Sequence, residues 1–133
     1  MVAAVRDDDG GQQCASAAVV RREEVRREEV RRLRLHELVF AHLRSLPLSA
    51  SCRWRTQALR NLDRVAVSVR GEAGQAAVRQ WRHLLCERPL AEITQVCLAG
   101  SEEADLLRVV SPLAGILPDV VRLQVLDQTR RSR

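Results

Sequence analysis

The chain has 133 residues and a mass of 15.0 kDa, enough for one modest hydrophobic core and too little for two domains of ordinary size. Its 22 basic residues are all arginine and stand against 17 acidic residues, so the net charge is +5, and only 2% of the residues are aromatic. Because base-stacking side chains are nearly missing and the charges are interspersed, specific recognition of nucleic acid is not indicated, although weak electrostatic attraction to it remains open.

The cysteines indicate a reducing compartment. They stand at positions 14, 52, 86 and 97, form no CxxC pair and follow no secretory signal. No segment approaches the roughly 20 consecutive apolar residues that span a bilayer. We therefore expect an intracellular protein, cytoplasmic or nuclear, with free thiols and no membrane partner.

The first half of the chain is predicted to be helical after a mobile tail at residues 1–15, which carry two glycines and three aspartates without an apolar period. Residues 21–25 and 26–30 repeat the sequence Arg-Arg-Glu-Glu-Val. Glu and Arg three or four positions apart stabilise an exposed helix, so this repeat predicts a solvated helical arm.

The same helix then becomes amphipathic and is expected to end at Pro47. Its apolar stripe consists of Leu35, Leu38, Val39, His42, Leu43 and Leu46. A histidine on such a stripe is interpreted as structural, since no second metal ligand lies at a helical spacing from His42. A short helix after Cys52 is expected to end near Arg60, which completes a helical segment over residues 16–60.

The second half predicts strands and helices in alternation over residues 61–128, followed by a basic tail at residues 129–133. The strands are placed at residues 65–69, 93–98 and 120–126 from β-branched and alternating apolar residues. One helix is expected from Gly71 and Gly74 to Pro89. Another follows Ser101, an N-cap residue before acidic residues that suit a helix N-terminus.

An apolar spacing L-x-x-L-x-L occurs three times in this half, at residues 62, 65 and 67, at 93, 96 and 98, and at 120, 123 and 125. The spacing resembles the leucine-rich repeat family. The resemblance implies an α/β fold, in which a long N-terminal helix precedes two β-α units and a terminal strand. A compact β-α-β-α-β domain similar to the STAS domains is the alternative that the same pattern allows.

A second motif precedes the repeats and consists of Glu37-Leu38-Val39, Leu43, Leu46-Pro47-Leu48 and Cys52-Arg53-Trp54-Arg55. It resembles an F-box, and F-box proteins commonly carry leucine-rich repeats after this segment. The resemblance implies binding to a Skp-type adaptor of a cullin ubiquitin ligase. The residues expected to face the adaptor or pack beneath it are Leu38, Val39, Leu43, Leu46, Pro47 and Trp54.

Catalysis is not indicated, because no cysteine or histidine lies in a family signature and no phosphate-binding glycine loop is present. His83 and Cys86 form an isolated pair, so no metal site or cofactor is expected. The leading expectation is a non-enzymatic adaptor or scaffold that binds protein. The alternatives are a STAS-like regulatory domain with Ser101 as a phosphorylation switch, an arginine-rich RNA- or ribosome-associated protein, and a fragment without a settled function.

Overall fold

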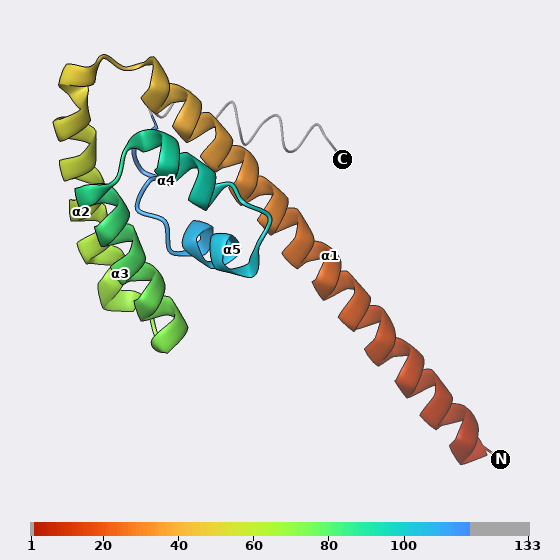
Figure 1. Cartoon of the computed structure of the whole chain (residues 1–133). Helices are drawn as coiled ribbons and strands as arrows, with labels where there is room; N and C mark the ends of the chain where they lie inside the picture. Colours follow the sequence, from red (N-terminus) through yellow and green to blue (C-terminus); the bar gives the residue numbers. More distant parts are fainter. Residues whose placement is uncertain (1, 118–133) are drawn as a thin grey trace. The chain divides into compact units, whose positions relative to one another are not determined.

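The structure, a computed structural model, describes the backbone of residues 2–117 and the side chains of residues 16–117. The chain forms two compact units, Met1–Arg31 and Arg32–Arg133, and each is described by itself. We call residues 16–31 the arm and residues 32–117 the module. The elements, drawn in Figure 1, are α1 (Val2–Ser45), the single 3₁₀ turn η1 (Leu48–Ala50), α2 (Ser51–Ser68), α3 (Glu72–Glu87), α4 (Leu90–Cys97) and α5 (Glu102–Val109).

The predicted α/β fold is wrong, because every regular element among residues 2–117 is helical. Residues 65–69, expected as a strand, form the last turn and the C-cap of α2, and residues 93–98 belong to α4 and its C-cap. The leucine-rich-repeat units and the STAS-like alternative both require these strands, so both are contradicted. The third expected strand, at residues 120–126, and the basic tail at residues 129–133 lie outside the described residues.

The L-x-x-L-x-L spacing led to the wrong fold because its first two apolar positions, three residues apart, also fit one face of a helix. Positions i and i+3 share a helix face just as they can share a repeat core, and Leu62 and Val65 continue a stripe on α2 that starts at Trp54 and Ala58. Val67 decides between the two geometries. A strand would place it on the same side as Val65, whereas on α2 its side chain is 89% exposed.

Other sequence predictions are confirmed. The helix expected between Gly71 and Pro89 is α3, which ends at Glu87. The expected N-cap is present, since the Ala104 N–H donates to Ser101 Oγ at 3.2 Å at the start of α5. α1 begins before Ser16, and the mobility predicted for residues 1–15 stays a prediction.

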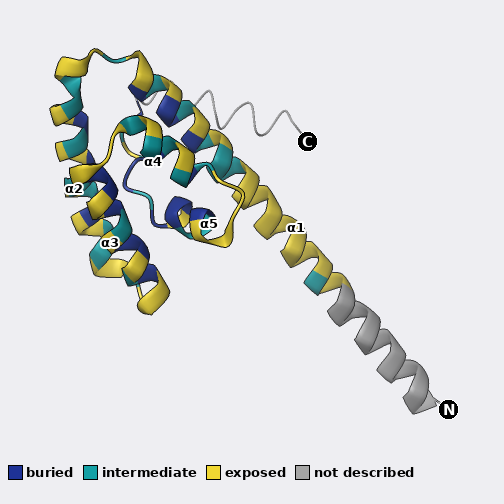
Figure 2. Cartoon of the chain, in the orientation of Figure 1, coloured by how far each residue is buried: buried dark blue, intermediate teal, exposed yellow. Residues whose placement is uncertain are grey.

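The arm is a helix without an apolar face. Its valines recur every fifth residue, a period that turns each successive one to a different side, and those at positions 20, 25 and 30 are all exposed. Figure 2 shows this stretch of α1 as mostly exposed, with no buried residue. The arm therefore obtains no stability from burial within its own unit.

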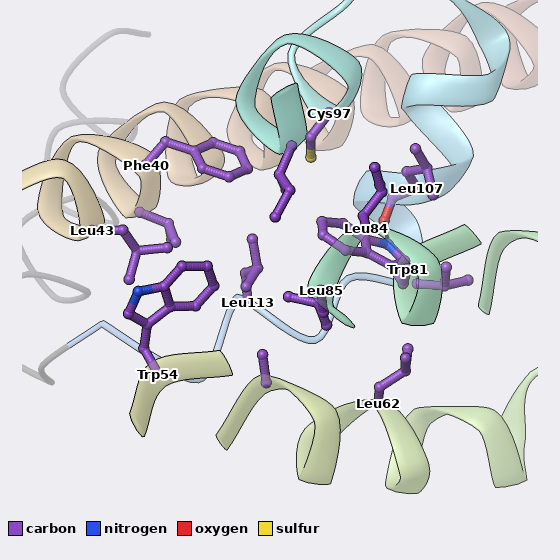
Figure 3. Close-up of a cluster of buried hydrophobic side chains, with 14 of the residues drawn as sticks. Phe40, Leu43, Trp54, Leu62, Trp81, Leu84, Leu85, Cys97, Leu107 and Leu113 are labelled. Carbon is purple, nitrogen blue, oxygen red and sulfur yellow. Dashed lines mark hydrogen bonds between the residues drawn. The ribbon is translucent and has the colours of Figure 1, made fainter. Parts of the chain in front are cut away.

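The module, in contrast, has one core to which all of its helices contribute (Figures 2 and 3). α2 packs against α3, and α5 packs against both α3 and α4. Trp81 and Phe40 are the largest of the fully buried side chains. The core consists of Val39, Phe40 and Leu43 from α1, Trp54, Ala58 and Leu62 from α2, Ala77, Val78, Trp81, Leu84 and Leu85 from α3, Ile93 and Cys97 from α4, Leu107 from α5, and Val110, Leu113 and Leu117.

Side chains from one helix complete the C-terminal end of another, where backbone carbonyls have no donor within their own helix. At the end of α2, Gln75 of α3 donates from its Nε2 to the carbonyl of Val69 at 2.8 Å. Near the end of α3, Arg55 of α2 donates to the carbonyl of Leu85 at 2.8 Å. The two helices thus satisfy each other's last turn.

The shorter helices are completed in the same way. Arg108 of α5 donates to the carbonyls of Cys97 at 2.6 Å and Ala99 at 3.2 Å, at the end of α4. Trp81 of α3 donates from Nε1 to the carbonyl of Leu107 at 2.8 Å, near the end of α5 (Figure 3). At the C-terminal end of each of the four helices α2 to α5, a side chain from another helix therefore donates to a backbone carbonyl.

Candidate protein-binding surface

The turn between α1 and α2 presents an apolar side chain to solvent. α1 ends before Pro47, which is extended at ψ 154°, and Ser45 Oγ donates to the carbonyl of His42 at 2.6 Å. The Ala50 N–H donates to the carbonyl of Pro47 at 2.9 Å and closes the 3₁₀ turn. On this hydrogen-bonded turn, Leu48 is 95% exposed.

Trp54, one turn further along α2, is 7% exposed and reaches the core beside Leu43 (Figure 3). The Arg55 guanidinium lies 4.8 Å from the centre of the Trp54 ring and donates from Nε to Ser51 Oγ at 3.2 Å. Partial burial lowers the pKa of Arg55, and the nearby Cys86 opposes that effect. Arginine nevertheless keeps its charge in proteins, so Arg55 is a fixed cation at this place.

Two clefts open beside the turn, and Leu46 and Trp54 line both of them. The larger, of about 770 Å³, follows the first turns of α2 and extends to Ile116. The smaller, of about 390 Å³, lies between the turn at Leu48 and the start of α4 at Leu90. We call the residues that line the two clefts, drawn from positions 42–60, 89–91 and 116, the Trp54 surface.

The charged side chains of the Trp54 surface are all basic. The larger cleft contains Arg53 and Arg60, and the smaller contains Arg44 and Arg55. The sequence holds no acidic residue between positions 37 and 63. No carboxylate among residues 16–117 forms an ion pair with any of these four arginines.

Comparisons with protein families, with curated proteins and with solved structures find no match to this chain.

The residues that the sequence singled out for partner binding separate into two groups. Val39 and Leu43 are buried in the core of the module, and Leu38 is half-buried. Leu46, Pro47 and Trp54 line the clefts, as does the buried Leu43. Their contact with a partner stays a prediction.

Sequence reasoning placed Leu48, Arg53 and Arg55 in the F-box-like motif but did not assign them to partner binding. It missed Arg44 and Arg60, and the residues at the start of α4, which come from a distant part of the chain. One signal was available. The stretch from position 38 to position 62 carries four arginines and is the longest in the chain without an acidic residue. The contribution of Pro89 and Leu90 could not be found without the fold.

The histidine and cysteine side chains of the described residues differ in their surroundings. No group of three or more His, Cys, Asp or Glu side chains among the described residues is arranged to hold a metal ion. His83 pairs with Glu87 at 2.8 Å, and His42 is half-buried in the larger cleft. Burial raises the pKa of the Cys97 thiol to about 12, so this cysteine is a core residue and a poor nucleophile.

His36 is the one histidine that the described core encloses, at 1% exposure. Its Nδ1 lies 2.7 Å from the carbonyl of Arg32, and its Nε2 has no hydrogen-bond partner within the described part of the chain. Burial lowers the pKa of His36, the bond to Arg32 opposes this, and the charges of Arg108 and Arg32 lower it further. His36 is thus neutral at pH 7.

A search of the described residues finds no helix that is both long enough and apolar enough to cross a membrane.

Proposed function

We propose that this chain is a non-enzymatic protein-interaction adaptor that holds a partner protein at the Trp54 surface. The observation that carries the proposal is Leu48, which is 95% exposed on a hydrogen-bonded turn beside clefts that share an apolar wall. Exposed apolar side chains next to clefts are typical of interaction sites, and arginine is enriched among the residues that dominate binding. The proposal assigns recognition, and no reaction, to this surface.

The F-box resemblance of residues 37–55 makes a Skp-type adaptor of a cullin ubiquitin ligase the first partner to test. Leu38 and Leu46 are half-buried and Pro47 is exposed, so all three retain surface for such a contact. The repeats that hold substrate in that family have no counterpart among residues 61–117, which are helical where they are regular. The proposal is therefore limited to contact with the Skp-type protein and includes no binding of a ubiquitination substrate.

An arginine-rich RNA- or ribosome-associated protein is the competing proposal. Single-stranded RNA is bound by stacking bases on aromatic rings and by neutralising phosphates. Trp54, 7% exposed, leaves little ring surface for a base. The apolar side chains around it would gain nothing from phosphate, so the geometry favours a protein partner.

The test is affinity capture from cell lysate with the intact chain and with Leu48→Asp. Val67→Asp is the matched control, because Val67 is 89% exposed on α2 and lines neither cleft. We expect a set of proteins that the intact chain and the control recover and that Leu48→Asp loses, with equal helix content by circular dichroism. Equal recovery by all three folded proteins would refute the proposal. A Skp-type adaptor within the lost set would support the F-box-like contact.

A further inference from the structure

The arginines of the Trp54 surface differ from several others in the module in having no carboxylate partner. Elsewhere, Arg82 pairs with Asp63 at 2.7 Å, Arg88 after α3 pairs with Glu92 of α4, and Arg108 pairs with Asp105 of its own helix, α5. On the Trp54 surface, Arg44 lies in the last turn of α1 and the other three arginines, at positions 53, 55 and 60, lie on α2. No described carboxylate forms an ion pair with any of the four. Repulsion among them is relieved by an acidic ligand.

The same surface offers apolar area that a purely ionic ligand would leave uncovered. Leu46 and Trp54 form a wall between the two clefts, and Leu48 and Leu90 border the smaller one. An occupant that covers this area gains by removing it from water. Charge and apolar area together specify an amphipathic occupant.

We propose that the partner's binding element is a short acidic segment that places one apolar side chain in each cleft, on either side of Leu46 and Trp54. Its carboxylates face Arg53 and Arg60 along the larger cleft and Arg44 at the smaller one. Arg55 stays with Ser51 and Leu85, to which it already donates, and supports Trp54. This inference rests on the proposed function, since it names the chemistry of the partner that the same surface binds.

The test is selection of a display library of random linear peptides on the intact chain, with Leu48→Asp as the counter-selection target. We expect the peptides that depend on Leu48 to be enriched in Asp and Glu and to carry two large apolar residues. For the tightest of them, Arg44→Glu together with Arg53→Glu lowers affinity by about tenfold or more. Arg64→Glu together with Arg79→Glu is the matched control, because both arginines are exposed outside the clefts, and it leaves affinity within about twofold.

The outcomes separate this inference from the proposed function. Peptides that depend on Leu48 but carry no excess of acid would overturn the inference and leave the adaptor proposal standing. If no enriched peptide depends on Leu48, the adaptor proposal and the inference both fail. Fluorescein-labelled poly-uridine RNA is the third probe: binding that Arg44→Glu with Arg53→Glu removes and Leu48→Asp preserves would make this a nucleic-acid surface and overturn both.

Discussion

The arm and helix α2 are both arginine-rich helices, yet they use arginine in opposite ways. The arm has five arginines with four glutamates interleaved and no buried side chain, whereas α2 has four arginines with one acid, Asp63, and a buried stripe of Trp54, Ala58 and Leu62. Interleaved acids neutralise the arm locally at spacings that favour a helix. In α2 burial supplies the stability, so Arg55 is left to donate to a carbonyl of another helix, and Arg53 and Arg60 lie in a cleft without a described carboxylate partner. The arrangement of the charges, more than their number, separates the solvated arm from the Trp54 surface, where we propose that a partner binds.

The largest expected effect tests whether burial in the module, and not the arm, supplies the stability of the chain. Trp81→Ala removes a fully buried ring and leaves the carbonyl of Leu107 without its donor, so we expect a loss of about 3–5 kcal/mol in the free energy of unfolding. Val25→Ala in the arm, where Val25 is 55% exposed, should cost less than about 0.5 kcal/mol. Urea denaturation followed by circular dichroism measures both. Similar losses would contradict the assignment of stability to the module.

Gly74→Ala tests how closely α2 and α3 approach. A Cβ at position 74 would lie 2.4 Å from Cγ1 of Val69, too near for the stiff valine to avoid without moving the end of α2. We expect a net loss of about 1–2 kcal/mol, although alanine favours a helix more than glycine does. Gly100→Ala is the control, since nothing lies within 4 Å of its added Cβ, and a glycine-to-alanine change that stabilised at position 74 would show that the contact is loose.

Arg55→Met in α2 and Arg22→Met in the arm compare what a single arginine contributes to stability in each region. Methionine keeps the apolar stem but loses the bond to the carbonyl of Leu85 and the contact with the Trp54 ring, so we expect a loss of about 1 kcal/mol. Arg22→Met in the arm should cost no more than a few tenths of a kcal/mol. Thermal unfolding of the two variants side by side gives the difference. An equal effect would mean that Arg55 is as dispensable as an arm arginine.

The smallest expected effect is a dependence of the module's stability on pH. The pKa of His36 in the folded chain lies below its ordinary value of 6.5, so the unfolded chain binds the proton more readily. Stability from this group is complete above pH 6.5 and falls as the pH is lowered through 6.5 towards the folded pKa. The melting temperature should therefore fall less between pH 7.5 and pH 5.5 for His36→Leu than for the intact chain. His42 and His83 remain in the variant, so an unchanged pH dependence would assign it to other groups.

The sequence predicted what depends on local periodicity and failed where neighbours in space decide. The helix through Trp81, the end of α1 at Pro47 and the cap at Ser101 each follow from residues within a few positions of one another. Leu62, Val65 and Val67 fit a strand and a helix alike, and only packing against α3 selects the helix that leaves Val67 in solvent. The part of the Trp54 surface at positions 42–60 could be predicted from the gap in acidic residues, but the contribution of Leu90 could be found only from the fold.

The hydrogen bonds by which side chains of one helix donate to the C-terminal carbonyls of another have a consequence for how the module unfolds locally. The donors and the carbonyls they satisfy are separated by 6 residues for Gln75 and Val69, 11 for Arg108 and Cys97, 26 for Trp81 and Leu107, and 30 for Arg55 and Leu85. Because α2, α3 and α5 each donate to a carbonyl of another helix, none of these three can detach without leaving a carbonyl elsewhere without its donor. In native-state hydrogen exchange, the amides of α2, α3 and α5 should share one opening free energy and behave as a single foldon, although α5 has only eight residues.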